Sequence, residues 1–269
     1  MLFRTIEMPA RTYPSFGRCI FCGKSEDLTD EHVVPEALTG IGEMKIALGS
    51  CRKHNNEANE RYEQPALRND FLPVRRMLSL KRKRRGKKTT SARISGFASN
   101  PHEIDLLTAD PSEFDRSLDP FDAPPIFTFV MHPPPGLLIG EERAEGSPSI
   151  RIGILHLGKP TPSNAEGTHA LRSPGVLGAP EMMVAKMAFC FAVAERGLDF
   201  ERYTDLRDLL MGRRSDVFNF VGTPVVEEKL ANRHLHAFYF RKREAFETVI
   251  VHLFASFGGP MYEVVLEPR

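Results

Sequence analysis

The spacing of apolar and polar residues along the chain predicts a mixture of helices and strands. Apolar residues recur at helical spacing over 180–196, and a shorter helix is expected over 203–211. Short apolar or alternating runs bounded by turn residues predict strands at 126–131, 150–157, 235–240, 248–254 and 261–266. Because turn residues separate the last three of these segments, we expect them to form an antiparallel meander at the C-terminal end.

The first 80 residues predict a different order: strand, turn, strand and helix. Two short strands, 29–34 and 45–48, are expected to form a hairpin. Helix-forming residues then run from Arg52 to about Glu63. Pro65 is expected to end this helix, because proline lacks the backbone N–H that a helix interior needs.

Composition places the chain among ordinary folded proteins. It has 269 residues, 41% of them hydrophobic and 26% charged, enough to bury a core in one large domain or two small ones. No apolar run is long enough to cross a bilayer, and the N-terminus lacks the apolar core of a signal peptide. Three of the four cysteines lie in a ligand pattern, so we expect no disulfide framework and a cytoplasmic location without a membrane partner.

The net charge of +1 conceals an uneven distribution. Residues 1–93 hold 19 Lys and Arg against 11 Asp and Glu, whereas residues 94–269 hold 17 against 24. A basic part is suited to a polyanion and an acidic part is not. Segment 81–88 has seven basic residues among eight, which must be solvated or bound to an anion. The expected parts are a module over 15–80, a basic linker over 81–99 and an α+β accessory domain over 100–269.

The N-terminal part carries a metal-ligand pattern. Two residues separate Cys19 from Cys22, and two separate Cys51 from His54. Thiolates and imidazole suit zinc, and four such ligands close its tetrahedral coordination. The pattern predicts a structural zinc ion that stabilises a module too small to build a core of its own. Glu31, His32 and Pro35 lie between the two pairs, and Asn55 follows the second.

This frame resembles the HNH endonuclease family, whose members share the ββα-metal fold. The resemblance covers about residues 15–80 and rests on a zinc knuckle, an acidic–His pair followed by Pro, and an Asn after the second ligand pair. The residues that carry it are Cys19, Cys22, Glu31, His32, Pro35, Cys51 and Asn55. Two positions depart from the family pattern. His54 replaces a cysteine as the fourth zinc ligand, and Ile46 stands where the family has an Asn that orients the catalytic His.

The resemblance implies a metal-dependent nuclease. In it, His32 is the general base that activates water, Glu31 and Asn55 are catalytic residues that hold a divalent ion, and Asn59 is a further ligand. Carboxylate and amide oxygens suit Mg²⁺ or Mn²⁺. Asn55 and Asn59 are four residues apart on the expected helix, so they share a face. With Ile46 in place of the family Asn, a backbone carbonyl is one group that could orient His32.

Basic residues near the end of the module and beyond it are candidates for contacts with a nucleic-acid backbone. Lys and Arg side chains position such a backbone without reading its sequence. The candidates are Arg75, Arg76, Lys81, Arg82, Lys83, Arg84, Arg85, Lys87 and Lys88. A solvated linker or an address signal is the alternative explanation of the block within this set.

The expected fold is therefore α+β, with an N-terminal zinc-stapled ββα-metal (HNH) module followed by a mixed α+β domain that ends in an antiparallel meander. The leading hypothesis is an endonuclease that hydrolyses phosphodiester bonds in DNA. Residues 100–269 would then regulate it, select its target, or form a homodimer; a role in host defence is analogy with the family. The first alternative is a zinc module that binds nucleic acid without cleaving it. The second is an RNA-directed nuclease, which the lack of aromatic residues in the basic block disfavours.

Overall fold

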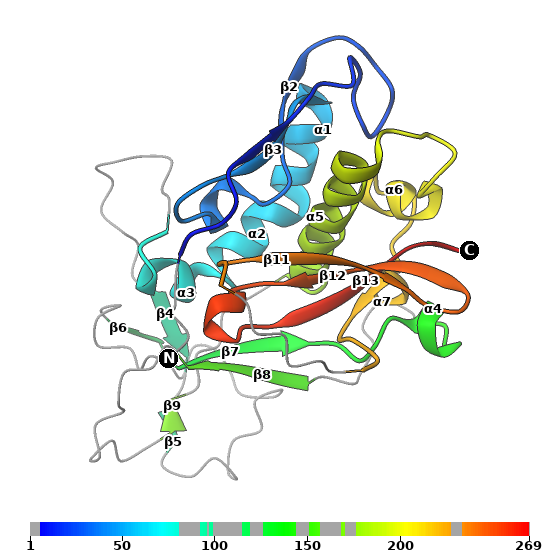
Figure 1. Ribbon diagram of the computed structural model, residues 1–269. Coiled ribbons are helices and arrows are strands. Elements are labelled where there is room, and N and C mark those ends of the chain that lie inside the picture. The colour runs from blue at the N-terminus through cyan, green and yellow to red at the C-terminus, as the bar shows by residue number, and fades with distance from the viewer. Residues whose placement is uncertain are drawn as a thin grey trace.

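The computed structural model describes residues 6–80, 92–95, 97–98, 115–118, 126–143, 151–156, 168–169, 176–226 and 233–268. These residues form a mixed α+β fold with several sheets (Figure 1), which confirms the expected fold class at that level. The sheets consist mainly of antiparallel strands. Within the described part of the chain, no helix is both long enough and apolar enough to cross a bilayer.

The N-terminal sheet has three strands in the order β1-β3-β2. They are β1 (Arg11–Tyr13), β2 (Leu28–His32) and β3 (Met44–Cys51), and the short 3-10 helix η1 (Glu36–Leu38) connects β2 to β3. β2 runs antiparallel to β3, and β1 runs parallel to it. The expected hairpin is confirmed, although β3 extends further at both ends than the sequence pattern predicts. The β2–β3 register shifts between Thr29 and Glu31, where β3 contributes extra residues.

The helix after this hairpin does not end at Pro65, so that prediction is wrong. Helical backbone runs on from α1 (Arg52–Ala58) through the π-helical turn η2 (Asn59–Glu63) into α2 (Gln64–Arg68). Pro65 lies in the first turn of α2, separated by one residue from the π turn, where a residue that has no N–H to donate is tolerated. A separate short helix, α3 (Leu72–Met77), comes next.

The C-terminal part is built on a four-stranded antiparallel sheet with the order β10-β13-β12-β11. The last three strands pair consecutively, which confirms the expected meander. The expected helices 180–196 and 203–211 are present as α5 and α6. The elements are α5 (Ala179–Arg196), α6 (Thr204–Leu210), α7 (Val217–Phe220), β10 (Val221–Gly222), β11 (Ala237–Lys242), β12 (Phe246–His252), η4 (Ala255–Phe257) and β13 (Met261–Pro268).

Three smaller strand pairs lie between these two parts. The two strands expected at 126–131 and 150–157 pair with each other as β7 and β8. The elements of this region are β4 (Ala92–Ser95), β5 (Phe97–Ala98), β6 (Asp115–Leu118), β7 (Ile126–Met131), α4 (Gly136–Ile139), β8 (Arg151–His156) and β9 (Thr168–His169). β4 pairs with β6, and β5 pairs with β9.

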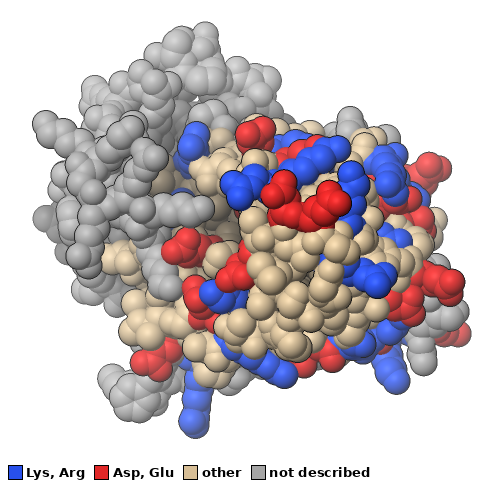
Figure 2. Space-filling view, turned by 90° about the horizontal axis from the view of Figure 1, so that it is seen from above, with Lys and Arg blue, Asp and Glu red and all other residues tan. Residues whose placement is uncertain are grey.

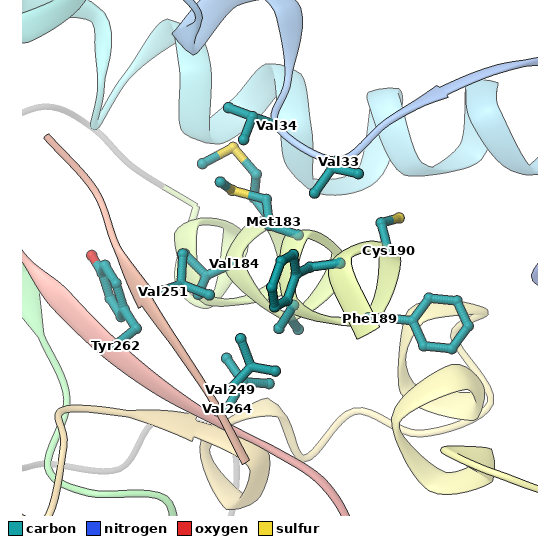
Figure 3. Close-up of a cluster of buried hydrophobic side chains, with 14 of the residues drawn as sticks. Val33, Val34, Met183, Val184, Phe189, Cys190, Val249, Val251, Tyr262 and Val264 are labelled. Carbon is teal, nitrogen blue, oxygen red and sulfur yellow. The ribbon is translucent and has the colours of Figure 1, made fainter. Parts of the chain in front are cut away.

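Helix α5 is the centre of the molecule. Its side chains are buried continuously from Met183 to Val193, and all of them except Lys186 are apolar. It packs against η2 and α2 on one side and against β12 and β13 on the other (Figure 1). Figure 3 shows Val33, which follows β2, on one side of α5, and Val249 and Val264 of the sheet on the opposite side.

The N-terminal module and the C-terminal sheet share one core. The buried apolar residues form a single cluster that includes side chains from both. The module proposed over 15–80 is therefore held in place by α5, which belongs to the later part of the chain. The division into a module over 15–80, a linker over 81–99 and an accessory domain over 100–269 stays a prediction.

Candidate functional site

The structure brings the four expected metal ligands together. Cys19 and Cys22 lie in the loop before β2, Cys51 ends β3, and His54 is in the first turn of α1. One ligand atom from each lies within 4.8 Å of all the others. These four residues could hold a metal ion, and three thiols with one imidazole are a donor set compatible with zinc.

The distances between the ligand atoms fit a tetrahedral ion. Bonds of about 2.3 Å from zinc to sulfur and about 2.0 Å to nitrogen place neighbouring ligand atoms about 3.6–3.8 Å apart. The Sγ atoms of Cys22 and Cys51 are 3.9 Å apart, and Cys19 Sγ is 3.8 Å from His54 Nδ1. Cys51 Sγ is closer to His54 Nδ1, at 3.1 Å, so this pair has to move apart by about 0.5 Å to hold the ion.

The turn that holds the two N-terminal cysteines and the environment of His54 both favour binding of a metal ion by this cluster. Gly23 adopts a positive φ of 79°, and its N–H donates to the Cys19 carbonyl, which closes the knuckle turn. Burial lowers the pKa of His54, which favours the neutral imidazole that binds metals. His54 Nε2 lies 3.9 Å from a carboxylate oxygen of Glu57, a group that could fix the ring orientation.

His32 lies at the end of β2 on the partly exposed face of the N-terminal sheet. Its side chain is 29% exposed, and its Nε2 is 3.9 Å from Glu43 Oε2. Asp30 lies two residues earlier on the same strand, and Lys45 is the register partner of His32 on β3. The Lys45 ammonium is 3.0 Å from Asp30 and 3.4 Å from Glu43, and its proximity lowers the pKa of Asp30. His32 is thus surrounded by two carboxylates and an ammonium group.

Glu31 lies on the opposite face of β2 and is completely buried. Its carboxylate forms an ion pair with the ammonium of Lys186, on α5. The same ammonium is 2.6 Å from a carboxylate oxygen of Glu63, on η2. Successive residues of a strand point to opposite faces, and the structure keeps this alternation at the end of β2. It therefore does not bring the expected ion ligand Glu31 together with His32.

The two expected asparagine ligands lie along the helix that follows β3. Asn55 Nδ2 is 3.4 Å from the Asp30 carbonyl and 3.4 Å from Ser50 Oγ, so this side chain rests against the β2–β3 hairpin. Asn59 lies one turn further along, and its Oδ1 accepts a hydrogen bond from Gln64. Ile46 is fully buried and pairs with Glu31. A charged group beside the His32 ring is instead the Glu43 carboxylate, 3.9 Å from Nε2.

The basic candidates for backbone contacts are described only in part. Arg75 donates from Nε to the Ala37 carbonyl and from Nη1 to the Leu67 carbonyl, both at 2.7 Å, so its guanidinium holds neighbouring backbone in place. Of Arg76 the structure describes the backbone, in α3. The block from Lys81 to Lys88 lies outside the described residues.

Sequence analysis missed Lys186 and Glu63. A signal was present, because Lys186 interrupts the apolar run of α5, and a charged residue inside a buried helix needs a partner. Its partner Glu31 is 155 positions away in the chain, so the pairing becomes visible only in the folded structure. Glu43 and Lys45 were also missed; both are ordinary polar positions around a turn.

A second group of buried polar residues lies at the start of α5. Glu181 Oε1 is 3.6 Å from His132 Nε2, and both side chains are almost fully buried. Burial raises the pKa of Glu181 to about 8 and lowers the pKa of His132 to about 4. At neutral pH both groups are therefore held in their uncharged forms, and their contact is between neutral partners rather than between ions.

Comparison with known proteins leaves the resemblance to the HNH family untested. No family model matches the chain, and neither curated proteins nor solved structures give a significant match. Functional interpretation therefore rests on the residues themselves: the cysteine–histidine cluster, the face around His32, and the buried Glu31.

Proposed function

We propose that this chain is a metal-dependent endonuclease of the HNH type that hydrolyses phosphodiester bonds in DNA. The observation that carries the proposal is the unit formed by β2, β3 and α1, which the Cys19, Cys22, Cys51 and His54 cluster closes. His32 lies in this unit on a face that solvent reaches. The order strand, strand, helix is that of the ββα-metal fold, which the sequence resembles.

In this proposal the four clustered residues hold a structural zinc ion and take no part in the reaction. A bound Mg²⁺ or Mn²⁺ would supply positive charge at the scissile phosphate and its leaving oxygen. His32 accepts the proton of the attacking water, and the neighbouring Glu43 carboxylate stabilises the imidazolium that forms. Glu31 and Asn55 are the proposed ligands of that ion, with Asn59 as a further one. To take this role, Glu31 would have to leave its ion pair with Lys186 and turn towards the face that carries His32.

A nucleic-acid-binding module without cleavage is the second candidate. It is favoured by the ion pair between Glu31 and Lys186, because a carboxylate is not available to a metal ion while an internal ammonium neutralises it. Figure 2 shows Lys and Arg interspersed with Asp and Glu on the face that it draws, so the described residues there form no unbroken basic field. A DNA contact over this face would rely on individual basic side chains, together with the segment 81–88.

Cleavage of supercoiled plasmid by zinc-loaded protein tests the proposal. We expect nicking that requires Mg²⁺ or Mn²⁺, falls at least 100-fold in His32→Ala, and persists in His234→Ala, which removes an exposed histidine elsewhere. Single-stranded RNA of matched length tests the RNA alternative. If neither substrate is cut at any ion concentration, while DNA is bound in a salt-dependent way, the binding module becomes the better account.

A further inference from the structure

The carboxylates of Glu31 and Glu63 enclose a single ammonium group. Glu31 comes from β2, Glu63 from η2, and Lys186 from α5, so three elements meet at this point. The side chain of Glu31 is 0% exposed and that of Lys186 is 5% exposed. Charged groups this deep in a protein persist only when a partner neutralises them.

This pocket holds one more negative charge than positive. The two carboxylates carry two charges and the ammonium carries one. The ammonium forms an ion pair with Glu31 and lies 2.6 Å from a carboxylate oxygen of Glu63, so it is in contact with both. Glu31 Oε2 has no hydrogen-bond partner among the described residues, although it is buried. A group with two positive charges would balance the pocket and give this oxygen a ligand.

The pocket also lies where a metal ligand is proposed. Glu31 is the residue that the nuclease hypothesis assigns to the catalytic ion, and Glu63 faces it across the Lys186 ammonium. A π-helical turn carries Glu63, and such turns often occur where a helix has to aim a functional side chain. Two carboxylates facing one another are ordinary ligands for Mg²⁺ or Mn²⁺.

We propose that Lys186 is a built-in cation that occupies the carboxylate pair Glu31–Glu63 and competes with a divalent metal ion for it. This inference rests on the proposed function in one respect, since it takes Glu31 to be the ligand of the catalytic ion. While α5 is docked, its ammonium fills the site. Metal binding requires the Lys186 side chain to withdraw, so the position of α5 controls how readily the ion enters.

The test is Mn²⁺ binding to the full-length, zinc-loaded protein, followed by electron paramagnetic resonance. Lys186→Met keeps an unbranched side chain of similar length and removes the charge. We expect Lys186→Met to bind one Mn²⁺ per chain at least tenfold more tightly than the wild type. Lys186→Arg, which keeps the positive charge, should behave like the wild type. The double variant Glu31→Gln/Lys186→Met should lose the gain, because one of the two ligands is then neutral.

Removal of the ammonium leaves two buried carboxylates unbalanced, so the variant could unfold. In that case Mn²⁺ should restore the folded state of Lys186→Met, seen as an ion-dependent rise of its melting temperature that the double variant does not show. Equal Mn²⁺ affinity in wild type and folded Lys186→Met, or an unfolded Lys186→Met that Mn²⁺ does not rescue, overturns the inference.

Plasmid cleavage by the same proteins separates this inference from the proposed function. Tighter Mn²⁺ binding without any cleavage would support the competition at the pocket and refute the nuclease. The opposite result is that wild type and Lys186→Met both cleave the plasmid, need the same Mn²⁺ concentration for half-maximal cleavage, and bind Mn²⁺ with the same affinity. That result would support the nuclease and overturn the competition between Lys186 and the metal ion.

Discussion

Removal of the metal from the cysteine–histidine cluster should destabilise the protein through its N-terminal module. The cluster joins the knuckle Cys19–Cys22 to the end of β3 and the start of α1, at Cys51 and His54. The loop before β2 has little regular structure of its own. It is also held by the burial of Ile20 and by the stacking of Phe21 on Phe189, so the metal is one of several contacts that fix it. The perturbation is either a strong zinc chelator or the variant Cys51→Ser, which replaces one thiolate by a weak ligand.

The connection between Cys22 and Cys51 closes a loop of about 30 residues. A cross-link over a loop of this length removes about 3.5–4 kcal/mol of unfolded-state entropy at 25 °C. The apparent binding energy of a structural zinc ion in a small domain is larger, about 10–16 kcal/mol. Loss of the ion should therefore cost at least about 4 kcal/mol, which corresponds to a fall in melting temperature of about 8–16 °C for a protein of this size.

Thermal unfolding and zinc content, measured on the same samples, check this prediction. We expect one zinc ion per chain in the wild type, loss of the ion in Cys51→Ser, and the fall in melting temperature given above. Cys190→Ala is the matched control: Cys190 is buried in α5 outside the cluster, so this variant should keep its zinc. A Cys51→Ser protein that retains one zinc ion and the wild-type melting temperature would refute the reasoning.

Three further predictions concern other parts of the structure. The pKa of Glu181 is raised to about 8, so the folded state keeps a proton that the unfolded state releases. The protonated carboxyl therefore contributes fully to stability below pH ~4.5, and this contribution should fall by up to about 2 kcal/mol between pH 6.5 and 8. Urea titrations at these two pH values should show the decrease in the wild type and not in Glu181→Gln. A Cβ on Gly222 would lie 1.9 Å from a backbone oxygen, so Gly222→Ala should cost about 1–3 kcal/mol and lower the melting temperature; an unchanged value would contradict the packing. Arg243 donates at 2.8 and 2.6 Å to the buried carboxylate of Glu263, so Arg243→Met should cost about 3–5 kcal/mol, and Glu263→Gln in the same chain should recover part of this in denaturant titrations.

Local patterns in the sequence predict most of the regular structure. Short apolar segments bounded by turn residues correspond to β7, β8 and the meander β11–β13, and the apolar helix corresponds to α5. The two-residue spacings predict that the members of each ligand pair lie close together, and the structure brings all four ligands into one cluster. Strands as short as β1 and β10 contain too few residues to show an alternating pattern in the sequence. Pro65 wrongly predicts a helix end, because the helix continues past it after a π-helical turn.

The candidate site is less predictable, because tertiary packing decides which way each side chain faces. Adjacent residues Glu31 and His32 must point to opposite faces of β2, but the sequence does not say which face α5 will cover. The structure buries Glu31 under α5 and leaves His32 partly exposed. The partner that neutralises Glu31, Lys186, could be recognised as unusual but not matched to it without the fold.

Chemical rescue of a His32→Gly variant tests the central claim most directly. The variant removes the imidazole and leaves a space at the end of β2, while the zinc cluster and the proposed ion ligands stay unchanged. Nicking of supercoiled plasmid in Mn²⁺ should be lost in His32→Gly and restored by added imidazole, in proportion to the concentration of its neutral form, whereas Asn55→Ala should not respond to imidazole. Wild-type rates in His32→Gly without imidazole, or no restoration with it, would contradict a role for His32 as general base.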